Sequence, residues 1–175
     1  PMVHKVITQL TEDVEWGHLD YLVVDLPPGT GDTQLTMLQT MPVTGAVIVT
    51  TPQEVALDDA RKGLEMFAKH DTVVLGIAEN MSTFACPDCG GEHDIFGSGG
   101  GEEFADEHDL PFLGSIPLDP AVREGGDGGK PTVLKDEDGT SDALRTITEN
   151  VANNTGIVHR QGISQYRRSE AASSD

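Results

Sequence analysis

Short apolar runs alternate with helical patterns of apolar and polar residues along most of the chain. Strands are expected where apolar residues follow one another, at residues 20–25, 44–50, 73–78 and 112–116. Helices are expected near residues 3–14, 31–41 and 54–67, from 102 onward, and at 142–153. This alternation predicts an α/β fold with a mostly parallel sheet. The uninterrupted apolar character of the strands fits a sheet that helices cover on both faces.

A helix start is predicted at Thr51-Pro52-Gln53-Glu54. Thr51 is expected to cap the helix, Pro52 suits its first position, and Glu54 can complete a capping box.

The length suits one domain, which we expect at residues 1–155. An irregular insertion at about 81–101 interrupts the pattern and carries both cysteines. Residues 125–139 are rich in glycine and charge and are expected to form a loop. Residues 156–175 are polar and have few apolar anchors, so a disordered tail is expected there.

The charge is strongly acidic, with 30 acidic against 11 basic residues and a formal net charge of −19. Nucleic-acid binding needs clustered Lys and Arg, so no nucleic-acid partner is expected. Adaptation to high salt, in which screening makes the self-repulsion tolerable, is favoured over an ordinary acidic cytosolic protein because the acids are spread along the chain and lysines are few. The chain has neither a long apolar run nor a charged and apolar leader, which predicts a cytoplasmic protein without a membrane partner. Because it begins with Pro1, we expect it to start inside a domain.

The run expected at 20–25 ends on a single carboxylate, Asp25, and continues as Pro27-Pro28-Gly29. In parallel α/β sheets ligands collect beyond the carboxyl ends of the strands, and an acid there can hold a water bound to Mg²⁺. Gly29 lets a backbone N–H approach a phosphate without a side chain in the way. A strand end with a tight turn and no ligand is the alternative interpretation.

The two cysteines, Cys86 and Cys89, form a Cys-x-x-Cys pair that suggests metal or redox chemistry. An iron or zinc centre prefers four ligands, so two copies of the pair at a symmetric interface would complete a bridging cluster. A zinc site within one chain is the second interpretation, with His93 as third ligand and Asp88 or Glu92 as fourth. A redox dithiol is the third, but the acidic neighbours are expected to raise a thiol pKa.

Six motifs occur in the order seen in Mrp-type (ApbC-like) iron–sulfur cluster carriers of the MinD/ParA-like superfamily, and the chain resembles this family over residues 1–134. They are Asp-Leu-Pro-Pro-Gly-Thr-Gly-Asp at 25–32, Thr-Thr-Pro-Gln-Glu at 50–54, Glu-Asn-Met-Ser at 79–82, Cys-Pro-Asp-Cys-Gly at 86–90, Ile-Phe-Gly-Ser-Gly-Gly-Gly at 95–101 and Ile-Pro-Leu-Asp-Pro at 116–120.

The resemblance implies a P-loop NTPase of MinD-like fold that uses ATP and Mg²⁺. It implies a homodimer that shares a [4Fe–4S] cluster through Cys86 and Cys89 and passes it to client apoproteins. Asp25 would be the acid associated with Mg²⁺, and Gly29 would sense the terminal phosphate. Asn80 would face the adenine base, and the backbone around Pro117 would line the same pocket.

The chain departs from the family in one respect, because the glycine-rich loop with its lysines (Walker A) is absent, together with its flanking strand and helix. In the family that strand lies beside the strand ending at Asp25, so a gap with unpaired backbone groups is expected here. ATP hydrolysis would therefore belong to the complete protein, and this chain alone is expected to be inactive. The rival interpretations are a MinD- or ParA-like positioning ATPase and a zinc-binding interaction module.

Overall fold

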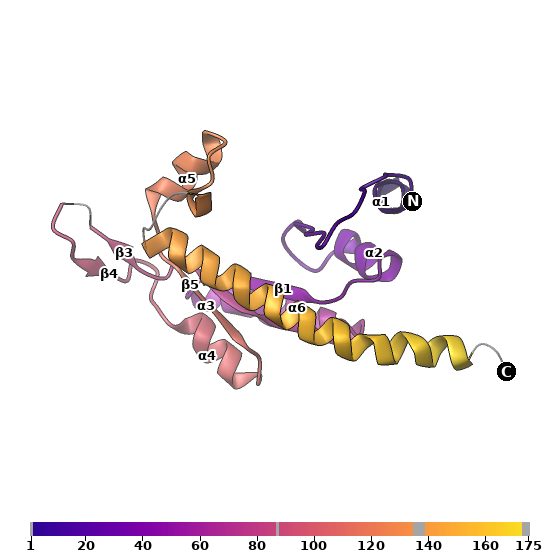
Figure 1. Cartoon of the computed structure of the whole chain (residues 1–175). Helices are drawn as coiled ribbons and strands as arrows, with labels where there is room; N and C mark the ends of the chain where they lie inside the picture. The colour runs from indigo at the N-terminus through magenta and orange to yellow at the C-terminus, as the bar shows by residue number, and fades with distance from the viewer. Residues whose placement is uncertain (1, 87, 135–138, 173–175) are drawn as a thin grey trace.

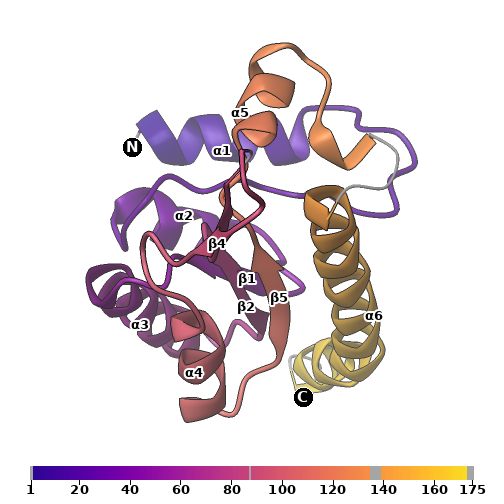
Figure 2. The same ribbon diagram turned by 90° about the vertical axis from the view of Figure 1, so that its left-hand side faces the viewer.

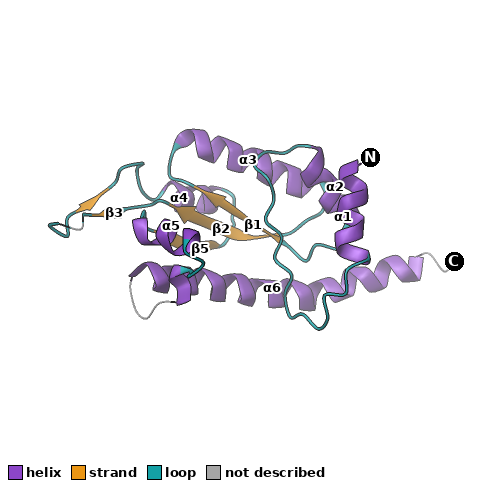
Figure 3. Ribbon diagram, turned by 90° about the horizontal axis from the view of Figure 1, so that it is seen from above, coloured by secondary structure: helices purple, strands orange, loops and turns teal. Residues whose placement is uncertain are grey.

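A parallel sheet of three strands lies between two layers of helices (Figures 1 and 2). The computed structural model describes residues 2–86, 88–134 and 139–172. The sheet order is β1 (Ala46–Thr50), β2 (Val74–Asn80) and β5 (Phe112–Ile116). Helices α3 (Glu54–Lys69) and α4 (Gly100–Glu107) cover one face, and α6 (Gly139–Ala172) covers the other (Figure 3). The predicted α/β class and the sheet covered on both faces are confirmed.

The remaining elements surround this body. They are α1 (Met2–Glu12), α2 (Asp32–Thr40), the short antiparallel pair β3 (Phe84–Ala85) and β4 (Glu92–His93), α5 (Pro120–Asp127) and a 3₁₀ turn (Thr132–Leu134). Helix α5 lies partly in the segment expected to be a loop at 125–139, of which residues 135–138 are outside the described part.

The main core lies between the sheet and the layer of α3 and α4. Its buried members come from all of these elements: Ile48, Ala60, Met66, Phe67, Ile77, Phe104 and Ala105. Ile48 and Ile77 are register partners on β1 and β2, so the helices pack on the middle of the sheet. This placement leaves the carboxyl ends of the strands free to carry loops.

Helix α6 is anchored to the opposite face by two asparagine side chains. The register shifts once in each strand pair, which leaves Leu75 of β2 and Leu113 of β5 without a register partner. A bulge of this kind interrupts the hydrogen-bond ladder. The Nδ2 groups of Asn154 and Asn150 donate to the carbonyls of Leu75 at 2.8 Å and Leu113 at 2.9 Å. One turn of α6 therefore satisfies the carbonyls that the two bulges release.

Replacing Asn154 with Ala is expected to lower the free energy of unfolding of the intact protein by about 1–3 kcal/mol. The Leu75 carbonyl, on a residue that is 5% exposed, would lose its partner. Urea unfolding followed by circular dichroism measures the change. Asn153→Ala is the matched control, because Asn153 is exposed on the same helix and its loss should cost nothing. Equal costs for the two variants would contradict the anchoring role.

The strand expected at 20–25 is wrong. These residues adopt no regular structure and are exposed, Val23 to 90%. A strand needs a neighbour for its backbone groups, and no described strand pairs with this segment or with the outer edge of β1. The apolar run is therefore present without the hydrogen-bond partners that a strand requires.

The capping box expected at Thr51–Glu54 is also wrong. The residue that precedes α3 is Gln53, no side chain caps the helix, and the hydroxyl of Thr51 donates to Gln53 Oε1 at 3.3 Å instead. Helix α3 begins at Glu54, so Pro52 lies outside it. Because the backbone of Gln53 is extended, the helix begins at Glu54, two residues later than the motif predicts.

Helix α6 continues through Ala172, whereas the composition predicts a disordered tail from residue 156. Before that point, Asn150 and Asn154 tie the helix to the sheet by hydrogen bonds, and the side chain of Ile147 lies against Gly114 of β5. Residues 173–175 lie outside the described part of the chain.

Candidate functional site

The loop that carries Asp25 and Gly29 is exposed to solvent. Asp25 is exposed, and within the described residues its carboxylate makes neither a hydrogen bond nor an ion pair. Gly29 has φ +96°, which L side chains rarely adopt, and a Cβ placed there would meet nothing within 4 Å. The turn thus exposes a carboxylate and a backbone N–H, which are the groups that a hydrated Mg²⁺ and a phosphate require.

Gln34 holds this loop and was not predicted as a site residue. It lies in the first turn of α2 and is 3% exposed. Its Nε2 donates to the carbonyl of Pro27 at 2.6 Å and of Pro28 at 3.3 Å. Prolines have no N–H with which to stiffen their own turn, so this side chain fixes the turn that precedes Gly29.

Asn80 and Pro117 are brought together at neighbouring strand ends. Asn80 is the register partner of Ile116, the residue before Pro117. The Oδ1 atom of Asn80 accepts a hydrogen bond from the N–H of Met81 at 2.9 Å, which is the arrangement of a turn residue. Within the described residues, no hydrogen bond or ion pair joins these two residues to Asp25 or Gly29.

Cys86 and Cys89 lie in the turn between β3 and β4, a hairpin that projects from the body (Figures 1 and 3). The N–H of Cys86 donates to the carbonyl of Gly91 at 2.9 Å, and the N–H of Gly90 donates to the carbonyl of Cys86 at 2.8 Å. Both thiols are free, Cys86 half-buried and Cys89 exposed. The hairpin therefore presents two thiols on one outward turn.

The expectation that acidic neighbours raise a thiol pKa is wrong for Cys86. Hydrogen bonds from the backbone N–H groups of Cys89 and Asp88, together with one from the Cys89 side chain, lower the pKa of the Cys86 thiol. These backbone donors point at the sulfur, so they stabilise the thiolate that metal binding requires.

The zinc interpretation within one chain has partial geometric support. A Cβ placed on Gly91 would lie 3.4 Å from Cys89 Sγ and 3.7 Å from His93 Nε2, so these two groups flank the same glycine. In the described part of the chain, however, three or more His, Cys, Asp or Glu side chains nowhere gather as a metal site.

Comparison with known proteins identifies the family. The model of the ParA-type NUBPL iron-transfer P-loop NTPases matches residues 1–152. The chain belongs to this family. It is similar to proteins named iron–sulfur cluster carrier protein. It is 50% identical over 158 residues to the one from Deinococcus radiodurans, a match that covers 90% of this chain and 45% of the relative. It is 48% identical over 153 residues to the one from Escherichia coli K12, a match that covers 87% of this chain and 42% of the relative.

Solved structures agree with this membership. A nucleotide-binding protein from Archaeoglobus fulgidus in complex with ADP is 42% identical, with a TM-score of 0.67 over 74% of this chain and 53% of that protein. The cell division ATPase MinD of Pyrococcus furiosus is 27% identical, with a TM-score of 0.63 over 86% of this chain and 57% of that protein. These neighbours confirm the predicted MinD-like fold. This iron-transfer P-loop NTPase spans about half the length of the curated relatives it matches.

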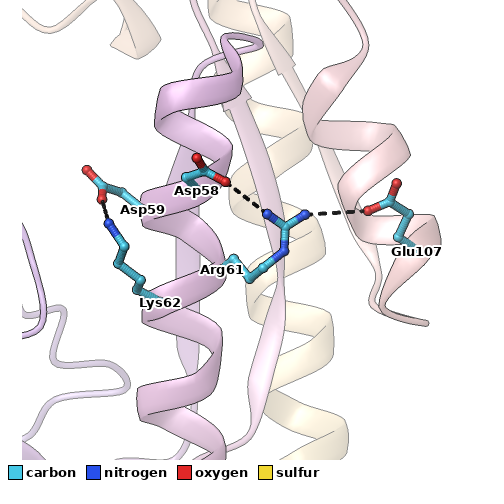
Figure 4. A network of polar contacts seen from close by, with 5 residues as sticks. All are labelled: Asp58, Asp59, Arg61, Lys62 and Glu107. Carbon is cyan, nitrogen blue, oxygen red and sulfur yellow. Dashed lines mark hydrogen bonds and ion pairs between the residues drawn. The ribbon is translucent and has the colours of Figure 1, made fainter.

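Two basic residues of α3 in this P-loop NTPase are paired with acids (Figure 4). Arg61 contacts Asp58 at 3.1 Å and Glu107 of α4 at 3.8 Å, and its guanidinium lies 5.6 Å from the ring centroid of Phe104. Lys62 contacts Asp59 at 2.8 Å, and this hydrogen bond raises the pKa of Lys62. Both basic side chains are exposed, so these pairs suit a solvated helix face. None of the described helices of the chain is long and apolar enough to cross a bilayer.

Proposed function

We propose that the intact protein is an iron–sulfur cluster carrier that holds a [4Fe–4S] cluster between two identical subunits. The observation that carries this proposal is the outward hairpin with two free thiols, in a chain whose relatives are named iron–sulfur cluster carrier proteins. One chain offers two thiolates and a cluster takes four, so Cys86 and Cys89 of two subunits complete the set. An exposed, shared site also suits transfer of the cluster to client apoproteins.

Nucleotide binding is proposed at the carboxyl ends of the strands and at the loop before α2. Asp25 would hold the water shell of Mg²⁺, and the N–H of Gly29 would contact the terminal phosphate of ATP. Asn80 and the backbone around Pro117 would contact the base, which their adjacent strand ends support. Bound Mg²⁺ would neutralise phosphate charge, while Gln34 keeps the Pro27–Pro28 turn in place.

We further propose that the intact protein has a strand between residues 20–25 and β1, with the lysine-bearing phosphate loop attached to it. Nine large apolar residues between positions 6 and 24 are at least 40% exposed, whereas Ile7 is buried; the nine are Val6, Leu10, Val14, Trp16, Leu19, Tyr21, Leu22, Val23 and Val24. Such contiguous exposure normally marks a surface that another segment covers. The unpaired outer edge of β1 supports the same proposal. ATP hydrolysis would then require this additional strand and its phosphate loop. Separately, we expect the intact protein to be in the cytoplasm.

Anaerobic reconstitution of the intact protein with iron and sulfide tests the proposal. We expect about four iron and four sulfide per dimer, as a shared [4Fe–4S] cluster requires, and transfer of that cluster to an apoferredoxin. Metal analysis and nucleotide turnover of the same preparation distinguish this function from the two rival interpretations. One zinc per monomer without sulfide would reject the carrier function in favour of a zinc module, and nucleotide turnover without any metal would favour a positioning ATPase.

A further inference from the structure

Glu79 is a buried acid that none of the proposed roles uses. It lies near the end of the central strand β2 and is 1% exposed. Its two carboxylate oxygens accept hydrogen bonds from the N–H of Gly99 at 3.1 Å and of Gly101 at 2.6 Å. In the described part of the chain it has no cationic partner. Burying a carboxylate without a counter-ion is costly unless hydrogen bonds compensate, and here the two backbone N–H groups of residues 99 and 101 supply that compensation.

The two hydrogen bonds of Glu79 close the base of the cysteine insertion. The insertion leaves the sheet at Asn80, one residue after Glu79, and returns at the amino-terminal end of α4. A helix is usually capped by a residue next to it in sequence, whereas Glu79 lies 20 residues before Gly99. The contact is close, since a Cβ on Gly101 would lie 2.9 Å from the Cβ of Glu79. The glycine run at 97–101 is therefore held in place at the start of α4.

The departing limb of the insertion is attached to the other proposed nucleotide-binding segment. The N–H and the hydroxyl of Ser82 both donate to the carbonyl of Ile116, at 3.1 and 3.2 Å. The N–H of Leu118 donates to the carbonyl of Thr83 at 2.7 Å. The bonded groups belong to Ile116 and Leu118, the two neighbours of Pro117 in sequence. Both limbs of the cysteine hairpin are thus bonded to the strand ends at which we place the nucleotide.

We propose that Glu79 is a positioning residue that couples nucleotide binding at Asn80 and Pro117 to the conformation of the cysteine hairpin; this inference rests on the proposed function. A displacement of the end of β2 moves the Glu79 carboxylate, and its two hydrogen bonds carry that displacement to residues 99–101. Because the departing limb is bonded to the same strand ends, the hairpin follows as one piece.

Hydrogen exchange of the hairpin peptide 84–94 in the intact protein, with and without Mg-ADP, tests the coupling. In the wild type we expect ADP to change exchange of this peptide by at least about fivefold, the lower end of usual coupling between sites. Glu79→Gln places an amide NH₂ against one of the two backbone N–H groups. It should still bind ADP, as measured by calorimetry, while the response of the hairpin disappears.

Two further variants and one independent assay complete the test. Gly101→Ala keeps the carboxylate but forces the helix start away from it, and it should uncouple the hairpin as Glu79→Gln does. Ser82→Ala removes one of two bonds to the same carbonyl and should keep the response. An unchanged response in Glu79→Gln, no response in the wild type with ADP bound, or loss of ADP binding in both uncoupling variants would overturn the proposal. Iron loading is measured separately, so a failed carrier function would remain distinguishable from failed coupling.

Discussion

Replacing both Cys86 and Cys89 with Ala is expected to abolish cluster loading, reducing iron from about four per dimer to background. Each subunit supplies two thiolates to the proposed site, so the double variant leaves the dimer without any cysteine ligand. The hairpin lies outside the main core and projects from the body. Nucleotide binding and the free energy of unfolding should therefore be unchanged. Iron and sulfide analysis and the visible absorbance of the reconstituted protein measure the effect.

His93→Ala is the matched control for this experiment. His93 flanks Gly91 together with Cys89, so it is the side chain that a zinc site in one chain would recruit. If the cluster bridges two subunits through the cysteines alone, His93→Ala should load the same amount of iron as the wild type. Full cluster loading in the double cysteine variant would show that the ligands have been assigned wrongly, and zinc binding that depends on His93 would favour the zinc module.

Local patterns predicted most of the secondary structure but not the contacts between distant segments. The strands β1, β2 and β5 were predicted because apolar runs reveal burial directly. The run at 20–25 has the same pattern, yet it forms no strand because a strand also needs a neighbour, which is a non-local property. Similarly, composition gave no sign that Asn150 and Asn154 anchor α6, because they bond to carbonyls that only the folded sheet exposes.

In the candidate site, too, local patterns were predictable and contacts between distant segments were not. Cys-x-x-Cys spacing located the thiols, but the direction of the Cys86 pKa shift depends on which way the turn aims its N–H groups. Gln34 and Glu79 escaped sequence analysis because each acts on backbone groups 6 to 22 residues away. Gly101 was the one available signal for Glu79, since a Cβ there would lie 2.9 Å from the Cβ of Glu79.

Replacing Asp25 with Asn is expected to lower Mg²⁺-dependent ATP turnover of the intact protein by about 10–100-fold, the usual cost of losing a group that holds a metal's water shell. The amide has the same size but lacks the charge that attracts hydrated Mg²⁺. Because Asp25 is exposed and has no hydrogen bond or ion pair among the described residues, its loss should change folding stability by less than about 0.5 kcal/mol. Steady-state turnover at varied Mg²⁺ separates the catalytic effect from any effect on folding.

Asp20→Asn makes the comparison specific. Asp20 is an exposed acid at the other end of the same apolar run. The substitution Asp20→Asn therefore removes the same charge as Asp25→Asn but leaves the loop that Gln34 holds unchanged. Turnover should remain at the wild-type level in Asp20→Asn, and only Asp25→Asn should need a higher Mg²⁺ concentration for half-maximal turnover. Equal losses in both variants would mean that general charge on this acidic chain, rather than a metal-holding carboxylate, governs turnover. Unaffected turnover in Asp25→Asn would reject the proposed role of Asp25.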